Sequence, residues 1–236
     1  MEANAKKNMI FDTEFSFCDF FNYQKGISRP TNYSLEIPEA LVIKWNNFRK
    51  WLDLHGASYK KILCPAIFTA HPNITYTGMV ASEDIDYDEV IVSIPSSIII
   101  NTEVAYCSEL NHIFKENPKL FSKKENSRYW EDYIMMSYIL YEKQKGEKSF
   151  WYPYLSILSE DYDCLLNWDE EEINEVQDKI LIDDAESQFT EVTDCWEDWY
   201  DCLKKYPEYF EEEYISFVQF KWCYILIYTR LFCMLQ

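Results

Sequence analysis

The sequence lacks the close cysteine pairs that structural metal sites require. None of its eight cysteines forms a C-x-x-C pair, and its three histidines stand apart from them. Structural zinc needs tightly spaced ligand pairs, so we expect no metal site. The N-terminus, MEANAKKNMIF, has no long apolar stretch after its charges, and a secretory signal is therefore not expected. Scattered cysteines in such a chain are typical of buried, reduced thiols, which predicts a cytoplasmic or nuclear protein.

Long apolar runs are also scarce. The run from Phe217 to Leu235 is the one that raises the question of a membrane span. Gln219, Lys221 and Arg230 interrupt it, and a charge near the middle of a bilayer is costly. We interpret this run as a buried helix and expect no membrane partner.

Basic residues are nearly absent from one long stretch. Between Glu160 and Glu213 there are 21 acidic and three basic residues, a balance of −18 against −19 for the whole chain. Such a field repels nucleic acid and anionic membranes and attracts basic proteins or peptides. The alternative is a solvated helical face that aids solubility. The predicted partner is therefore a basic protein or peptide, and not nucleic acid.

The residues that are present suffice for a packed core. Of the 236 residues, 48% are hydrophobic and 18% aromatic, which suits one large domain or a domain with a sizeable insertion. Residues 1–35 carry aromatic clumps without a steady period and are interpreted as an N-terminal arm. A helix is predicted to begin at Pro38 and to end at Gly56, with apolar residues at helical spacing between them.

The next part of the chain has residue patterns typical of β-strands. Residues 61–70 form a short apolar run that contains Pro65, which predicts an edge strand. Residues 74–81 and 89–94 are two β-like runs joined by the charged stretch 82–88, and residues 98–100 add a further β-branched run.

Helical patterns follow from Asn101 onward. We predict helices over 129–143, near Asp169, through Trp196 and Trp199, and from about Glu211. Strands followed by helices predict an α+β fold. Three or four short strands make a small sheet, which needs more partners or a covering layer to be stable.

Gly78 lies between strand-like runs, where glycine marks either a β-bulge or a close approach by a ligand. The stretch from Tyr76 to Pro95 reads Y-T-G-M-V-A-S-E-D-I-D-Y-D-E-V-I-V-S-I-P. It resembles the opening of a SET domain, the protein methyltransferase fold, whose usual wording is G-x-G-x-x-A, then D-I, an acidic residue, an alternating apolar run and I-P. The matching positions are Gly78, Ala81, Asp84, Ile85, Glu89, Val90, Ile91, Ile94 and Pro95.

Two further segments resemble one branch of that family. The segment from Trp151 to Leu158 is similar to the insert signature W-x-P-Y-L-x-x-L-P, with Ser159 in place of the last proline. Thr229-Arg230-Leu231-Phe232 resembles the S/T-R-x-F segment that closes the insert helix. The branch contains the Rubisco large-subunit lysine methyltransferase and the actin-histidine methyltransferase.

This resemblance implies a partial SET β-fold with a large helical insert. The implied parts are the N-terminal SET part at 36–101, an acidic insert at 102–210 and a returning helix at 211–236. It implies S-adenosylmethionine as cofactor and in-line methyl transfer to a protein side chain, with lysine as the first choice of substrate residue and histidine as the second. By position, the cofactor-binding residues would be Thr75, Thr77, Gly78, Thr229 and Arg230, with the arginine near the cofactor carboxylate.

The sequence departs from the family's motifs at two places. Tyr76 stands at the first glycine of G-x-G, where it would strain the turn or block the cofactor. The family continues to a D-x-x-N-H segment and a catalytic tyrosine, and neither follows Phe232 before Gln236. Asn111-His112 precedes the insert and is interpreted as structural. We therefore assign no catalytic residue, and expect a truncated enzyme or a scaffold without its chemistry.

A different class of function stays open beside this one. The chain would then be a non-catalytic interaction protein that holds a basic partner through its acidic helical insert. Trp196 and Trp199 lie among acidic residues and could form a surface feature for such a partner, although core packing is the preferred interpretation for both.

Overall fold

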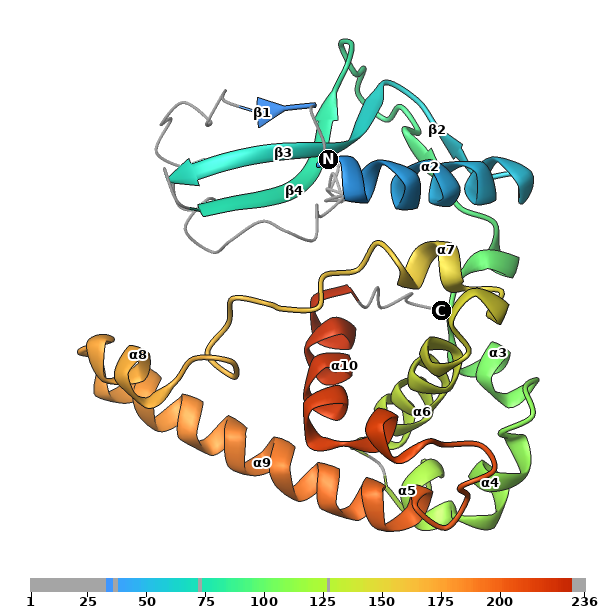
Figure 1. The fold of residues 1–236 in the computed structure, drawn as a ribbon, viewed down its shortest axis with the longest axis vertical. Helices are drawn as coiled ribbons and strands as arrows, with labels where there is room; N and C mark the ends of the chain where they lie inside the picture. The colour runs from blue at the N-terminus through green and yellow to red at the C-terminus, as the bar shows by residue number, and fades with distance from the viewer. Residues whose placement is uncertain (1–32, 36–37, 72–73, 127, 231–236) are drawn as a thin grey trace, which may run out of the picture. The chain divides into compact units, whose positions relative to one another are not determined.

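The computed structural model describes residues 33–35, 38–71, 74–126 and 128–230. They divide into two compact units, one up to Ile98 and one from Ile99 onward. We call them the strand unit and the helical unit and describe each by itself (Figure 1). Most of the predicted N-terminal arm, residues 1–35, lies outside the described residues.

The strand unit begins with the predicted helix. Helix α2 spans Glu39–Leu54 and is preceded by Pro38 at its N-cap position. Gly56 has φ +80°, the left-handed conformation that glycine adopts readily after a helix. Both ends therefore follow from local residues, as the sequence predicted.

Two small antiparallel sheets make up the rest of this unit. Strands β1 (Tyr33–Ser34), β3 (Ile62–His71) and β4 (Ile74–Ala81) form one sheet in the order β1-β3-β4. Strands β2 (Ser58–Tyr59) and β5 (Val92–Ser93) form the other. The two β-like runs predicted at 74–81 and 89–94 are thus not partners, because β4 pairs with β3 and β5 pairs with β2.

The edge position predicted for the strand with Pro65 is wrong. Strand β3 lies between β1 and β4, and Pro65 sits where the register shifts between Leu63 and Ala66. A bulge accommodates a residue without an N–H, and β1 covers β3 only farther along, at Ile67 and Phe68.

The strand expected at residues 98–100 is also not formed. Ser96–Ile98 is a 3-10 turn, in which the Ile98 N–H donates to the Pro95 carbonyl at 3.0 Å, and Ile99 and Ile100 belong to no element. The β propensity of three isoleucines is overridden by this turn and by burial of Ile98.

The helical unit contains the predicted helices and several short ones. Their bounds are α3 (Thr102–Tyr106), α4 (Asn111–Glu116), α5 (Pro118–Phe121), α6 (Trp130–Gln144), η2 (Gly146–Lys148), α7 (Tyr152–Leu155), α8 (Glu170–Glu175), α9 (Lys179–Leu203), η3 (Glu212–Ile215) and α10 (Phe217–Arg230). Helix α6 is the centre of the core, since α3, α5, α7 and α10 all pack against it. The α+β fold is confirmed.

Helix α10 buries Phe220 and the run from Trp222 to Ile227, as predicted for the apolar run. No helix in the described part of the chain is long and apolar enough to cross a membrane. Trp199 is fully buried, and its Nε1 donates to Ser137 Oγ at 2.9 Å. Trp196 donates to the Ile215 carbonyl at 3.1 Å, so both tryptophans pack the core rather than forming a surface pair.

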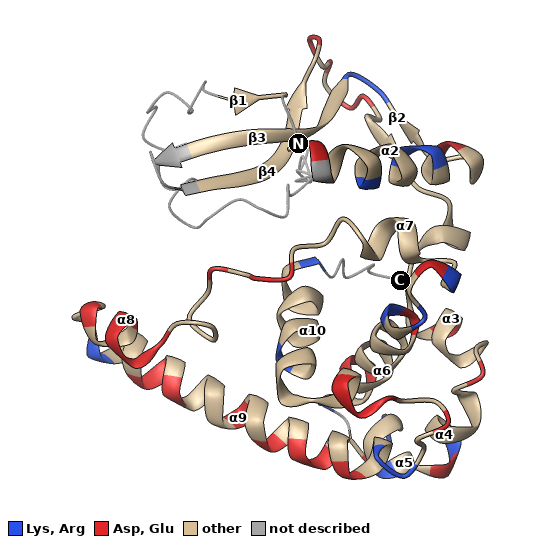
Figure 2. Cartoon of the chain, viewed as in Figure 1, with Lys and Arg blue, Asp and Glu red and all other residues tan. Residues whose placement is uncertain are grey.

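Acidic residues recur along α8 and α9 in the helical unit (Figure 2). Asp169 caps α8, and its carboxylate accepts from the Glu172 N–H while Glu172 accepts from the Asp169 N–H. This capping box uses two carboxylates where the helix dipole favours negative charge.

Candidate functional site

The five residues predicted to bind the cofactor lie in two places. Thr75, Thr77 and Gly78 are on β4 in the strand unit, and Thr229 and Arg230 end α10 in the helical unit. Each group is therefore described within its own unit.

The strand carries its predicted residues on opposite faces. Side chains alternate along a strand, so Thr75 and Thr77 share one face while Tyr76 and the Cα hydrogens of Gly78 share the other. The edge of β4 turned away from β3 has no partner strand among the described residues. Backbone groups along that edge can therefore meet a ligand.

A neighbouring residue in the same sheet explains why Gly78 lacks a side chain. A Cβ at this position would stand 3.1 Å from Cε2 of Phe68, a ring that covers the glycine from the neighbouring strand. Phe68 also stacks on Tyr76, with ring centroids 5.2 Å apart and planes within 10° of parallel. The bulge at Pro65 lies next to Gly78 across the strand pair. The glycine therefore accommodates the Phe68 ring, on the face opposite to both threonines.

Tyr76 does not strain this strand. It lies within the extended run of β4, and the residues with positive φ in the described chain do not include it. The strained turn considered from the sequence is therefore wrong. The Tyr76 ring instead packs flat against Phe68 on the face of Gly78.

The end of α10 carries the other two predicted residues. The Thr229 hydroxyl lies 2.8 Å from the Ile225 carbonyl and donates back into its own helix, a common arrangement for threonine. Arg230 is half-buried, and its charge acts on Tyr154. Burial raises the pKa of the Tyr154 hydroxyl, and the nearby guanidinium opposes that rise.

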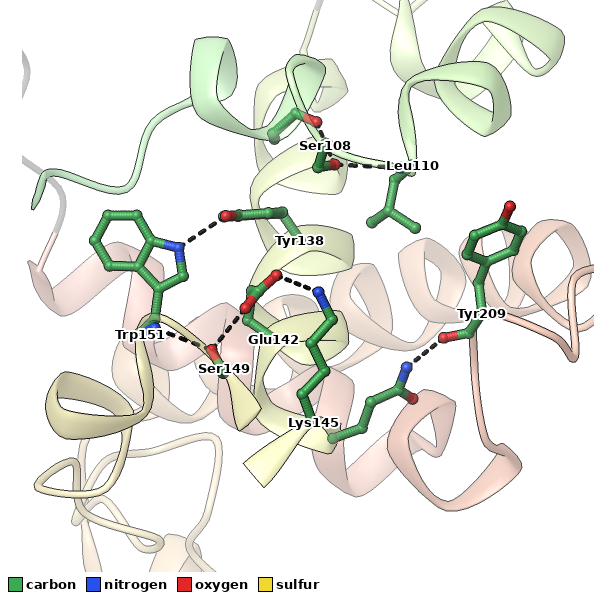
Figure 3. A network of polar contacts seen from close by, with 10 residues as sticks. Ser108, Leu110, Tyr138, Glu142, Lys145, Ser149, Trp151 and Tyr209 are labelled. Carbon is green, nitrogen blue, oxygen red and sulfur yellow. Dashed lines mark hydrogen bonds and ion pairs between the residues drawn. The ribbon is translucent and has the colours of Figure 1, made fainter. Parts of the chain in front are cut away.

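The insert signature is anchored to α6 by a buried polar network (Figure 3). Glu142 accepts from Ser149 Oγ at 2.6 Å and from Lys145 Nζ at 2.7 Å. Ser149 Oγ also accepts from the Trp151 N–H at 3.0 Å. The Trp151 indole Nε1 donates to the Tyr138 hydroxyl at 2.7 Å, and Trp151 is only 3% exposed. These bonds fix where the signature begins.

Sequence reasoning missed the α6 side of this network. The available signal was the spacing of Tyr138, Glu142 and Lys145, which at i, i+4 and i+7 share one helix face. A glutamate on the apolar side of a core helix needs a partner. The hydroxyl of Ser149 supplies one, at the start of the segment that resembles the family signature.

The signature and the α10 segment meet in the structure. Trp222 Nε1 on α10 donates to the Ser159 carbonyl at 2.8 Å, at the position where the family has proline. Lys143 Nζ lies 3.6 Å from the centre of the Trp222 ring and donates to Glu160 at 3.0 Å. Lys221 Nζ donates to the Leu166 carbonyl at 3.1 Å. Hydrogen bonds between residues 55 and 63 positions apart in the sequence thus join these segments into one packed assembly with α6.

The Asn111-His112 pair packs within the helical unit. Both residues begin α4, and His112 Nδ1 is 2.8 Å from the Glu109 carbonyl. The imidazole also lies beside Tyr209, with ring centroids 5.1 Å apart.

Similar sequences are protein methyltransferases. The chain is 28% identical over 165 residues to the [fructose-bisphosphate aldolase]-lysine N-methyltransferase of Arabidopsis thaliana, covering 69% of the chain and 30% of that protein. It is 27% identical over 135 residues to the Rubisco large-subunit N-methyltransferase of Pisum sativum, covering 57% and 24%. It is 23% identical over 156 residues to the mouse (Mus musculus) actin-histidine N-methyltransferase, covering 65% and 25%. The chain thus spans less than a third of these relatives. No protein-family model matches it.

Solved structures show the same fold. The SET domain of the Rubisco enzyme LSMT, bound to lysine and AdoHcy, aligns with a TM-score of 0.60 and 21% identity, covering 84% of this chain and 41% of that one. Rubisco LSMT bound to AdoMet aligns with a TM-score of 0.56 and 22% identity, covering 80% and 41%. At this identity the likeness establishes the fold.

Proposed function

The chain is a relative of the SET-type protein methyltransferases of the Rubisco and actin-histidine branch, and from this we propose that it serves S-adenosylmethionine-dependent methylation of a protein side chain. Lysine is the preferred substrate residue, because a solved relative with this fold is bound to lysine. Histidine is the second choice, because other relatives are actin-histidine enzymes.

One observation carries the proposal. The two segments that resemble the insert signature and the S/T-R-x-F segment are packed together, through Trp222 and Ser159 and through the charge of Arg230 on Tyr154. Unrelated sequence matches would not be expected to fold into one assembly in the family order. The SET-type fold supports the same conclusion.

The residues of the chain suit the methionine end of the cofactor in their chemistry. In the helical unit, the Arg230 guanidinium is matched to a carboxylate. In the strand unit, taken by itself, the Thr75 and Thr77 hydroxyls and the open backbone edge of β4 are matched to an ammonium group. The Phe68 ring covers the opposite face at Gly78, so the proposed contacts of Gly78 use its backbone. When bound, the cofactor supplies a sulfonium-activated methyl group.

Calorimetric titration with S-adenosylmethionine tests the cofactor proposal. We expect a dissociation constant on the order of micromolar for the full chain, and roughly tenfold to hundredfold weaker binding for Arg230→Ala, because a charge-assisted hydrogen bond is worth about 1.5–3 kcal/mol. Arg128→Ala is the matched control, since it removes a guanidinium that pairs with Glu191 in the helical unit. No heat of binding at millimolar cofactor, or equal weakening by both substitutions, would refute it.

Turnover is a separate question. Transfer of a labelled methyl group from S-adenosylmethionine to a protein substrate measures it, independently of cofactor binding. The six cysteines that the structure describes are in no disulfide, which supports our proposal of a cytoplasmic or nuclear location.

A second candidate function is the binding of a basic partner without catalysis. The observation that favours it is the concentration of acidic residues on α8 and α9, with little compensating charge between Glu160 and Glu213. Cofactor titration separates the two candidates, because this second function needs no S-adenosylmethionine.

A further inference from the structure

An open groove of about 590 Å³ runs along α9 in the helical unit. Arg128, Tyr129 and Tyr133 line it at the start of α6, and Glu191, Asp194 and Asp198 line it from α9. The α9 residues are three and four positions apart, so they form one face of the helix. The groove therefore has one aromatic wall and one acidic wall.

Two of the three carboxylates of the acidic wall, those of Asp194 and Asp198, form no ion pair within the described part of the chain. Asp194 and Asp198 are exposed, stand one helical turn apart, and have no ion-pair partner in the described part of the protein. The nearest cations in sequence are engaged elsewhere or distant on the helix, since Lys204 pairs with Asp201 and Lys179 with Asp183. Like charges at this spacing repel each other, and a bound cation would relieve the repulsion.

One cationic side chain of the protein, that of Arg128, already lies at the groove. The Arg128 guanidinium lies 4.7 Å from the centre of the Tyr129 ring and 2.7 Å from Glu191. It thus makes a cation–π contact and an ion pair at one end of the groove. The Arg128 side chain is 70% exposed, so this contact does not bury the charge. Asp194 and Asp198 continue the same acidic wall beyond it.

We propose that this groove binds a basic segment of a partner protein, with a lysine or arginine side chain seated against Asp194 and Asp198. The proposal deepens the second candidate function and rests on it, and it is independent of cofactor binding and methyl transfer. Charge complementarity identifies the occupant as a basic peptide rather than a nucleic acid, whose phosphates this wall repels.

A solvated acidic helix would also attract basic peptides, but without preference for one face. Binding in the groove predicts that particular residues matter, because only some of the acidic residues on α9 line it. Glu186 and Glu197 are exposed on the same helix and do not line the groove. They provide a control pair with the same loss of charge.

Fluorescence anisotropy with the full chain tests the proposal. The probe is a short labelled peptide of alternating arginine and glycine, and the reference peptide carries neutral citrulline at each arginine. We expect saturable binding of the arginine peptide that weakens as salt rises, and no binding of the citrulline peptide.

The variants decide whether the groove is the site. Asp194→Asn with Asp198→Asn is expected to weaken binding roughly tenfold, the size expected for two exposed charge pairs. Glu186→Gln with Glu197→Gln is expected to change it by less than about twofold. Arg128→Ala is expected to strengthen binding, because it removes the internal guanidinium.

Equal weakening by the two double variants would overturn the proposal, since it would mean attraction by the overall field. Equal binding of the citrulline peptide, or tighter binding of a DNA oligonucleotide than of the arginine peptide, would also overturn it. Thermal unfolding of each variant shows whether its fold is retained. A null result with S-adenosylmethionine leaves this proposal standing, and a null result with the peptide leaves the cofactor proposal standing.

Discussion

Ser149 is the residue at which the anchoring of the insert signature can be tested most directly. Its Oγ donates to Glu142 at 2.6 Å and accepts from the Trp151 N–H at 3.0 Å, and the residue is 5% exposed. Ser149→Ala removes both bonds without adding volume. The variant leaves the buried Glu142 with Lys145 as its remaining partner.

The expected loss follows from those two bonds. A hydrogen bond to a charged group contributes about 1.5–3 kcal/mol, and a buried N–H left without an acceptor costs about 1–3 kcal/mol. Because neighbouring effects do not add fully, we expect the free energy of unfolding to fall by about 2–4 kcal/mol. For a chain of this size that lowers Tm by roughly 5–15 °C.

Urea unfolding followed by circular dichroism measures this difference. The matched control is Ser156→Ala in the same segment, where the hydroxyl donates to the Pro153 carbonyl at 3.2 Å in a partly buried site. We expect that control to lose no more than about 1 kcal/mol. A loss below about 1 kcal/mol for Ser149→Ala, or equal losses for both serines, would show that the network does not hold the signature.

Three further predictions follow from the two units. Gly78→Ala places a Cβ 3.1 Å from the Phe68 ring and should lower the free energy of unfolding by about 1–3 kcal/mol, with most of it regained when Phe68→Leu is added; no recovery would contradict this. Burial raises the pKa of the Asp132 carboxyl, so its contribution to stability is present below about pH 4 and lost as pH rises through the folded-state pKa. Asp132→Asn should therefore gain stability relative to the parent from about pH 3 to pH 7, and a constant difference would contradict this. Burial also raises the pKa of the Cys202 thiol to about 11, so iodoacetamide at pH 8 should label the exposed Cys107 and spare Cys202, as peptide mass spectrometry would show.

The helices with explicit local signals were predictable. Pro38 and Gly56 bracket α2, and Asp169 with Glu172 closes the capping box of α8. These signals act between residues a few positions apart, so they can be recognised without any tertiary contact. The buried character of α10 followed in the same way, from charges that interrupt an apolar run.

Strand pairing was not predictable in the same way. The β propensity of residues 98–100 did not produce a strand, and Pro65 lies in a central strand at a bulge. Pairing depends on which distant segment offers a matching strand edge. Contacts between segments far apart in the sequence decide this, and the β propensity of a short segment does not include them.

For the candidate site, too, local motifs were predictable and long-range contacts were not. Sequence motifs located β4 and the end of α10, because a glycine and an arginine stand at fixed positions in recognisable motifs. They did not reveal that the Phe68 ring explains the glycine at 78, or that Thr229 donates into its own helix. Both facts depend on where neighbouring backbone and side chains come to lie.

By itself, the sequence determined the family likeness, the helical signals and the separation of charge, since composition, wording and short-range spacing need no folded chain. Only the tertiary structure decided that β4 pairs with β3, that Glu142 accepts from the Ser149 hydroxyl, and that Asp194 and Asp198 line an open groove beside Tyr129 and Tyr133. Those outcomes require residues distant in sequence to meet, and the burial and shape that follow from such meetings are properties of the fold as a whole.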